Sequence, residues 1–408
     1  MHALLKDLRV IEGSSFVAAP SCGLHLSQMG AEVIRFDTIG GGPDFNRWPQ
    51  AGNGASLFWE GLNKGKKSVA IDLRRPEGRE IATALITAPG TGAGIFVTNF
   101  PAAGFLAHDH LAQHRPDLLT VRIMGHASGQ QAVDYTVNNA VGLPYMTGPQ
   151  SLGDEPVNHV LPAWDLLAGA HAAFSVLAAE RLRRETGQGQ ELRLPLSDLA
   201  MATVGNLGMI AEAILSGESR PRCGNALFGA FGRDFMTSDD KRIMIVAITA
   251  NQWRGLIDAL NITAKIAALE TALSVSFAHD EGLRFVHRDV LFTIVGTAVK
   301  ARPLNDLSAI FDAKGVCWSL YRHLHEALRD DDAFSARNPM FTEISHPSGH
   351  AYLTPGASTS FTGLERLPPS RAPHLGEHTE WVLAEVMGLP SNEIARLHDA
   401  GIVASSRA

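Results

Sequence analysis

Asp165 is the residue of this sequence whose type and setting are best suited to chemistry. It is the lone acid in the run Asn158-His-Val-Leu-Pro-Ala-Trp-Asp-Leu-Leu-Ala-Gly-Ala170. Pro162 suits the first position of a helix, because its missing N–H would have no partner there. Asp165 then ends the first turn, where the helix dipole favours an ionised carboxylate. An ionised but poorly hydrated carboxylate is a good nucleophile. An acid that only helps the helix to start fits the same spacing, and spacing alone favours that interpretation.

The helix that carries Asp165 is predicted to bury one face. Apolar or small residues recur along it with the helical period, at Leu166, Ala170, Phe174, Leu177 and Ala178.

The residues before this helix predict the sheet that must support it. A short buried strand at 8–11, a helix at 20–29 and a strand at 32–37 form a β-α-β opening. Such an opening indicates a parallel, Rossmann-like sheet. The pattern continues with helices at 76–88 and 104–114, strands at 94–98, 118–123 and 190–194, and an apolar helix at 196–215.

The first turn of this sheet, Gly13-Ser-Ser-Phe-Val-Ala-Ala-Pro20, is a candidate oxyanion site. It lacks the G-x-G-x-x-G fingerprint, so NAD binding is not expected. The turn would still direct backbone N–H groups toward a ligand above the sheet. Those of Phe16, Val17, Ala18 and Ala19 are the candidates for stabilising a tetrahedral oxyanion.

A basic turn precedes another strand. Lys64, Lys66 and Lys67 lie within four residues, and Arg74 and Arg75 follow. In an acidic protein such a cluster could meet a polyphosphate. A solvated run of charges is the alternative, and the pattern alone favours it.

Length and patterning predict two domains in this chain of 408 residues. We expect a large Rossmann-like domain over 1–225 and a smaller α+β domain over 226–325, opening with a hairpin at 231–237 and 242–248. The segment 326–408, with helices at 379–387 and 391–399, is expected to return to the large domain or to a partner subunit.

Composition excludes several classes of function. The formal charge of −7 offers no basic excess for nucleic acid. Neither a signal pattern nor a long apolar run is present, so we expect a cytoplasmic protein without a membrane partner. Cys22, Cys223 and Cys317 fit neither a disulfide framework nor a zinc motif, and no metal site is predicted.

Several stretches together resemble the class III CoA-transferase family over nearly the whole chain. They are Leu8-Arg-Val-Ile-Glu12, Ala18-Ala-Pro20, Gln28-Met-Gly-Ala-Glu-Val-Ile34, Leu62-Asn-Lys-Gly-Lys-Lys-Ser68, Asp72-Leu73, Thr98-Asn-Phe-Pro101, Asp165 and Leu375-Gly-Glu-His-Thr379. The resemblance implies a two-domain subunit in an interlocked homodimer. It also implies that Asp165 forms anhydride and aspartyl-CoA intermediates. Coenzyme A would be part of the substrate, with no permanently bound cofactor, and Lys66, Asn99 and Phe100 would contact it.

Further stretches resemble family members that move CoA between the C1 and C4 carboxyl groups of mesaconyl-CoA, the thioester of a small dicarboxylic acid. They are Phe16-Val-Ala-Ala-Pro20, Arg35-Phe-Asp-Thr-Ile-Gly-Gly-Gly42, Asp134-Tyr-Thr-Val-Asn138, Gly142-Leu-Pro-Tyr-Met-Thr-Gly-Pro149, Asn158-His-Val-Leu-Pro-Ala-Trp-Asp165, Gly229-Ala-Phe-Gly-Arg-Asp-Phe235 and Asn338-Pro-Met-Phe341. Such a reaction needs a cation on the distal carboxylate, and Arg47 and Arg233 are the candidates.

The chain departs from the family pattern at two places. Val17 stands where formyl-CoA transferase-like members carry Gln, and Pro101 follows Asn-Phe where many members carry a basic residue. Three alternatives stay open: an intermolecular CoA-transferase using a free diacid, an α-methylacyl-CoA racemase, and a CoA-binding subunit without turnover. Val133 stands where the racemase pattern has a His, with His126 and His159 nearby.

Overall fold

The computed structural model describes residues 1–101 and 103–406, which fold into two compact units. Unit 1 comprises Met1–Val141, His159–Ala211 and Asp331–Ala408, and unit 2 comprises Gly142–Asn158 and Glu212–Asp330. The predicted boundaries were 225 and 325, and the segment 142–158 was predicted with the large domain. In the structure this segment packs with unit 2, whereas the C-terminal segment belongs to unit 1.

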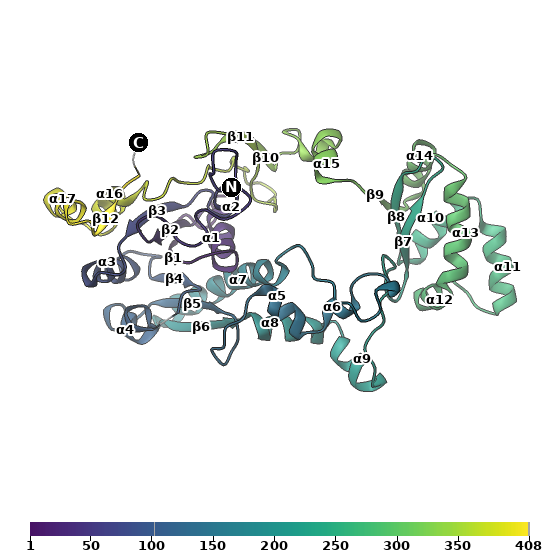
Figure 1. Ribbon diagram of the computed structural model, residues 1–408, viewed down its shortest axis with the longest axis horizontal. Helices are drawn as coiled ribbons and strands as arrows, with labels where there is room; N and C mark the ends of the chain where they lie inside the picture. The colour runs from purple at the N-terminus through teal and green to yellow at the C-terminus, as the bar shows by residue number, and fades with distance from the viewer. Residues whose placement is uncertain (102, 407–408) are drawn as a thin grey trace. The chain divides into compact units, whose positions relative to one another are not determined.

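A seven-stranded sheet forms the centre of unit 1 (Figure 1). Its order is β12-β3-β2-β1-β4-β5-β6, and every pairing is parallel except that of β12 with β3. The order 3-2-1-4-5-6 is that of doubly wound nucleotide-binding sheets, so the Rossmann-like sheet is confirmed. The strands are β1 (Arg9–Gly13), β2 (Glu32–Asp37), β3 (Lys67–Ile71), β4 (Ile95–Thr98), β5 (Leu119–Met124), β6 (Gln190–Pro195) and β12 (Val403–Ala404).

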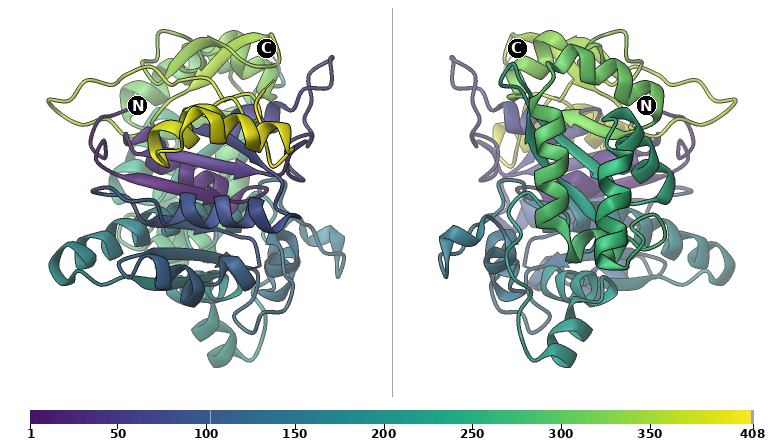
Figure 2. Two further views of the ribbon diagram at one scale, coloured as in Figure 1. Left: turned by 90° about the vertical axis from the view of Figure 1, so that its left-hand side faces the viewer. Right: turned by 90° about the vertical axis from the view of Figure 1, so that its right-hand side faces the viewer.

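Helices cover both faces of this sheet, as parallel strands require. α1 (Ala18–Gln28) and α7 (Ala163–Thr186) lie on one face, and α3 (Pro76–Ile86), α4 (His108–His114) and α17 (Ser391–Asp399) lie on the other (Figures 1 and 2). The second face holds a core of buried side chains from the strands, α3 and the C-terminal turns, including Ile34, Phe36, Phe96, Leu383 and Leu397. The C-terminal segment thus completes the core of the first unit.

α1 and α7 pack closely through small residues. An added Cβ at Gly169 would lie 1.9 Å from Ser21 Oγ and 2.8 Å from the carbonyl oxygen of Ala18. The buried face of α7 is accordingly made largely of Ala168, Gly169, Ala172, Ala173, Val176 and Ala179. The predicted stripe does not make this contact: Phe174 is 68% exposed in the single chain, and Ala170, Leu177 and Ala178 are also exposed. Large side chains would hold the two helices apart, so the contact selects small ones.

The remaining elements of unit 1 are short. They are α2 (Leu57–Leu62), α5 (Asp134–Ala140), α8 (Leu196–Asn206), α16 (Thr379–Trp381), the π-helical turn η4 (Val382–Val386), the 3-10 turns η1 (Gly104–Leu106) and η3 (Asp332–Phe334), and the hairpin β10 (Phe341–Ser345) and β11 (Ala351–Pro355). The predicted helix 104–114 is therefore a 3-10 turn followed by α4.

The predicted apolar helix 196–215 is divided at Leu207 and Gly208 into α8 and α9 (Met209–Ser216). Within residues 1–101 and 103–406, no single helix is long and apolar enough to cross a membrane. α8 and α9 meet the length and composition only as a pair bent by 67°.

Unit 2 is an α+β unit built on a three-stranded antiparallel sheet. Its order is β7 (Phe231–Met236), β8 (Arg242–Ala247) and β9 (Cys317–Leu320), which confirms the predicted hairpin. Its helices and turns are α6 (Leu143–Met146), η2 (Gln150–Leu152), α10 (Ala250–Ala259), α11 (Thr263–Leu273), α12 (Glu281–Val286), α13 (Arg288–Lys300), α14 (Leu304–Lys314) and α15 (Leu324–Asp330). Phe231, Trp253 and Phe311 are among the side chains of its own core.

Candidate active site

A cavity of about 610 Å³ in unit 1 lies where β1, β4 and β5 end. Its volume is in the range of ligand pockets, and its position matches the switch point of a doubly wound sheet, where the chain order reverses between β1 and β4. The residues that line it and enter the argument are Phe16, Val17, Ala18, Arg47, Phe58, Asn99, Asp134 and Asp165.

Asp165 is the third residue of α7, and a second acid holds it there. The buried carboxylate of Asp134 accepts hydrogen bonds from the backbone N–H of Trp164 at 2.7 Å and of Asp165 at 3.1 Å. Its other oxygen lies 2.8 Å from His159 Nε2. Asp134 thereby serves as the N-terminal cap of α7. Pro162, predicted at the first helical position, is instead the residue before the helix.

Burial governs the ionisation of Asp165. Removal from water, followed by the neighbouring charge of Asp134, raises the pKa of the carboxyl from 3.8 to about 6, although Arg47 opposes the shift. Burial and the charge of Asp134 therefore outweigh the helix dipole, which was predicted to favour the ionised carboxylate. A carboxylate with a pKa near 6 remains mostly ionised at neutral pH and is more basic than an exposed one, which suits attack on a carbonyl carbon.

The raised pKa predicts an acid limb in the pH profile of activity. Below about pH 6 the nucleophile becomes protonated, so kcat/KM should fall about tenfold per pH unit. Asp134→Asn removes the negative charge that raises the pKa of Asp165, so this limb should move to lower pH. Asp109→Asn, an exposed acid on α4, is the control and should leave the limb in place. If the acid limb of Asp134→Asn stayed at the same pH as that of the unmodified protein, the charge of Asp134 would not be a cause of the raised pKa of Asp165.

The turn after β1 forms a second wall of the cavity. Phe16 adopts a left-handed conformation with φ of 66°, a costly conformation for a bulky residue and one that clusters at functional sites. Asn99 holds the turn: its Oδ1 accepts from Ser15 N–H at 2.9 Å and its Nδ2 donates to the Ser15 carbonyl at 2.7 Å. In the described part of the chain, no protein acceptor takes the N–H groups of Phe16, Val17 and Ala18.

Arg47 supplies the positive charge of the cavity. Its guanidinium carbon lies 5.3 Å from the ring centroid of Phe16 and 5.4 Å from that of Phe58. Its charge is close enough to Asp165 to lower the pKa of that carboxyl. Between residues 1 and 406, apart from residue 102, no carboxylate forms an ion pair with it. Arg47 is therefore free to bind an anionic substrate group.

Lys66 lies outside this cavity, and its predicted contact with CoA gains no support from the structure. Its ammonium is buried and donates to Glu12 Oε1 at 3.0 Å, the Pro20 carbonyl at 2.8 Å and Asn63 Oδ1 at 3.0 Å. The rest of the basic turn is engaged as well. Lys64 donates to the Pro355 carbonyl at 3.0 Å, and Lys67 pairs with Glu32 at 2.6 Å.

We therefore expect Lys66→Met to affect stability. It leaves the buried Glu12 carboxylate without its closest cation, and such a loss costs about 3 to 5 kcal/mol. Lys67→Met removes a pair that is about a quarter exposed and should cost about 1 kcal/mol or less. Urea unfolding compares the two variants. A raised KM for the CoA ester in Lys66→Met with unchanged stability would instead restore the predicted CoA contact.

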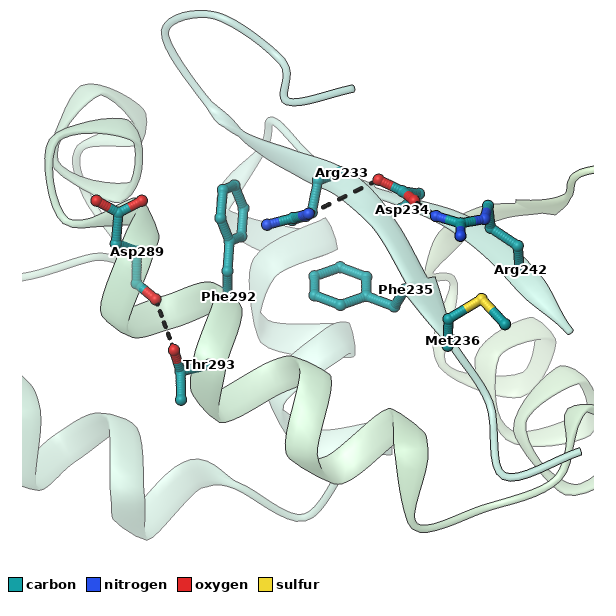
Figure 3. A pocket seen from close by; sticks show the side chains of 8 residues that line it. All are labelled: Arg233, Asp234, Phe235, Met236, Arg242, Asp289, Phe292 and Thr293. Atoms are coloured by element: carbon teal, nitrogen blue, oxygen red, sulfur yellow. Dashed lines mark hydrogen bonds and ion pairs between the residues drawn. The ribbon is translucent and has the colours of Figure 1, made fainter. Parts of the chain in front are cut away.

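The other three candidate site residues, Ala19, Phe100 and Arg233, do not line this cavity. Ala19 is fully buried in α1, and Phe100 packs against the core beside β4. Arg233 belongs to β7 of unit 2, in a pocket of about 360 Å³ whose lining comes from that unit. Its guanidinium lies 4.9 Å from the Phe292 ring centroid and 3.9 Å from Asp234 Oδ1 (Figure 3).

The contact of Asp134 with α7 is what reasoning from the sequence missed. The sequence analysis named Asp134 in a family-like stretch and His159 near the racemase position. The spacing of residues 134 and 165, with loops between them, gave no sign that Asp134 contacts the start of α7. Within the described residues, no group of three or more His, Cys, Asp or Glu side chains is placed to hold a metal ion.

The cavity at the switch point of this doubly wound sheet combines a half-buried aspartate at the start of α7 with a cation, an arrangement suited to acyl transfer through a carboxylate. The chain belongs to CoA-transferase family III, whose sequence profile matches residues 5–379.

Two relatives and one solved structure are similar to this chain over nearly its whole length. The chain is 50% identical to 2-methylfumaryl-CoA isomerase of Chloroflexus aurantiacus over 405 residues, covering 99% of this chain and 98% of the relative. It is 26% identical to succinyl-CoA:mesaconate CoA-transferase of Haloarcula hispanica, covering 96% and 98%. A crystal structure of a CAIB/BAIF family protein from Brucella suis has the same fold, with a TM-score of 0.74 at 24% identity over 95% of this chain and all of that one.

Proposed function

We propose that this protein is a 2-methylfumaryl-CoA isomerase, which moves CoA between the C1 and C4 carboxyl groups of one mesaconyl residue. The observation that carries the proposal is the identity of 50% along the whole chain to an enzyme of that name. Three features of the cavity support it: Asp165 as the candidate nucleophile, N–H groups on the turn after β1 that find no acceptor among the described residues, and the Arg47 cation.

In the proposed reaction, Asp165 attacks the thioester carbonyl and releases CoA thiolate, which leaves a mixed anhydride. The thiolate then attacks the aspartyl carbonyl of the anhydride, giving aspartyl-CoA and free mesaconate. The second carboxylate of mesaconate attacks the aspartyl-CoA carbonyl and expels CoA thiolate, which gives a second mixed anhydride. The thiolate then attacks the mesaconyl carbonyl of this anhydride, forming the isomeric thioester and releasing the Asp165 carboxylate. Because the freed mesaconate is itself the acceptor, no external acid is needed.

Two parts of the cavity support these steps. The N–H groups of Phe16, Val17 and Ala18 are proposed to stabilise the tetrahedral oxyanions, a contribution of about 3 kcal/mol per donor in other acyl transfers. Arg47 is proposed to bind the carboxylate that is not reacting. Asn99 orders the turn through both of its hydrogen bonds to Ser15 and lines the cavity where CoA is expected to enter.

An interlocked homodimer is part of the proposal. Large apolar side chains of α7 and of the α8–α9 region lie in solvent in the single chain, with exposures of 68% for Phe174, 69% for Leu207 and 87% for Leu215. Exposed apolar side chains of this size are characteristic of protein interfaces. Light scattering after size exclusion should give twice the chain mass of 43.7 kDa.

The alternative is an intermolecular transferase that uses a free diacid, favoured by the relatives of that kind at 26% identity. The two functions differ in the fate of the freed diacid. We expect purified protein to isomerise unlabelled mesaconyl-CoA in the presence of excess ¹³C-mesaconate or ¹³C-succinate without taking up label. Oriented groups reach effective concentrations of about 10⁵ M, far above any added acid. Label entering at the rate of isomerisation would establish the transferase instead.

A further inference from the structure

Arg35 is a buried arginine of β2 that does not line the cavity, yet its hydrogen bonds lead there. It is 1% exposed and donates from Nε and Nη2 to the two oxygens of Asp37, at 2.9 and 2.8 Å. Nη2 also donates to both oxygens of Asp44, at 2.9 and 3.0 Å. The guanidinium plane rests on Trp59, 4.5 Å from the ring centroid. Arg35 is thus fixed from several sides.

Asp44 begins the turn that carries Arg47. Its side chain is 1% exposed, whereas Asn46, Arg47 and Trp48 are exposed. The carbonyl of Asp44 accepts from the backbone N–H of Arg47 at 3.2 Å. On the other side, the Arg47 carbonyl accepts from Ser56 Oγ at 2.6 Å. The Arg35–Asp44 contact, together with the half-buried Phe45 ring 5.1 Å from that of Trp59, therefore anchors a turn whose residues 46–48 are exposed.

The same cluster also reaches the turn after β1, which forms another wall of the cavity. Arg35 Nη1 donates to Asn63 Oδ1 at 3.2 Å, and the same oxygen accepts from Lys66. Lys66 donates to Glu12, which also accepts from Ser14 Oγ at 2.8 Å, two residues before Phe16. One network thus joins the bases of the two segments that bear Phe16 and Arg47. Breaking a buried ion pair is costly because it leaves the remaining charge unpaired, so the members of this network hold one another in place.

We propose that Arg35 is a positioning residue: through Asp44 it fixes the turn that presents the Arg47 guanidinium to the cavity, and so controls whether the freed diacid is retained between the two half-reactions. The proposal rests on the proposed function of this site. A planar guanidinium can bind Asp37 and Asp44 at once, which a lysine ammonium cannot do with the same geometry.

Arg35→Lys and Asp44→Asn test the proposal by the ratio of label uptake from free ¹³C-mesaconate to isomerisation, measured by mass spectrometry of the CoA ester. Both variants keep side chains of similar size, and circular dichroism establishes that each is folded. We expect the ratio to rise about tenfold or more in each, because a mobile Arg47 lets the diacid escape. If Arg35→Lys does not fold, Asp44→Asn alone decides.

A double-mutant cycle separates positioning from general loosening. Combining either change with Arg47→Ala should give no more label uptake than Arg47→Ala alone, because the changes act through the same guanidinium. Arg183→Lys is the matched control. This arginine of α7 is also buried and donates to the carbonyls of Ala93 and Gly94, so its loss should leave the ratio unchanged.

Two results would overturn the proposal: an unchanged ratio in the folded Asp44→Asn variant, or effects that simply add to that of Arg47→Ala. If instead the proposed isomerase function is wrong, the unmodified protein itself takes up label as fast as it isomerises mesaconyl-CoA.

Discussion

Asp165→Ala is expected to remove essentially all turnover while leaving the cavity intact. The covalent route needs a carboxylate at the start of α7, and losses of a nucleophile reach about 10⁴-fold or more in kcat. Asp165→Glu should also be severely impaired, because the longer side chain moves the attacking oxygen by about 1 Å from a position fixed by α7. Steady-state assays with mesaconyl-CoA measure both effects. An Ala variant that retained about a tenth of the activity would rule out Asp165 as the nucleophile.

The same residue allows a control that is independent of activity. Folding raises the pKa of Asp165 from 3.8 to about 6, so the ionised carboxylate destabilises the folded protein above pH 6, and this cost disappears below about pH 4. At 1.36 kcal/mol per unit the cost is about 3 kcal/mol at most. Asp165→Asn should therefore unfold at a higher temperature than the unmodified protein at pH 8, and the difference should vanish at pH 4. A loss of stability of Asp165→Asn at pH 8 would contradict the raised pKa assigned to Asp165.

The sheet was predictable because each parallel strand is a short apolar run followed by a helix. Its strand order was not, since β1 pairs with β2 and with β4, and no local pattern tells which strand lies beside which. The order matters for function, because it brings the turn after β1 next to Asn99 after β4. The resemblance to the family, rather than spacing, pointed to Asp165.

Packing decided the points that sequence reasoning missed. The stripe predicted for α7 mixed small residues with the large Phe174 and Leu177, but Gly169 against Ser21 leaves room only for small ones on the face that meets α1. The basic turn was interpreted as a polyphosphate contact or a solvated run of charges, and the family resemblance gave Lys66 a contact with CoA, so its burial in an ion network was not foreseen. One signal could have corrected this: Glu12 directly follows the strand predicted at 8–11, Arg35 and Asp37 lie in the strand predicted at 32–37, and charges buried in a parallel sheet require partners. The link between Arg35 and Asp44 is tertiary, although only nine residues separate them.

Arg47→Ala should convert the protein from an enzyme that retains its diacid into a slower one that exchanges it. The guanidinium is the one cation that lines the cavity in the described part of the chain, and it has no carboxylate partner there. Truncating one partner of a charge-assisted contact costs about 2 to 4 kcal/mol, or about 30- to 1,000-fold in rate.

The freed diacid would then leave before its second carboxylate attacks, so ¹³C-mesaconate should enter the product. Arg47→Lys should have an isomerisation rate and a label uptake between those of the unmodified protein and of Arg47→Ala. The lysine ammonium keeps the charge but loses the bidentate geometry. Arg181→Ala, a residue of α7 whose side chain is 84% exposed, serves as the control and should do neither. If Arg47→Ala slowed isomerisation without admitting label, the cation would assist the chemical step, and another group would have to retain the diacid. If it changed neither rate nor label uptake, Arg47 would have no part in binding the distal carboxylate.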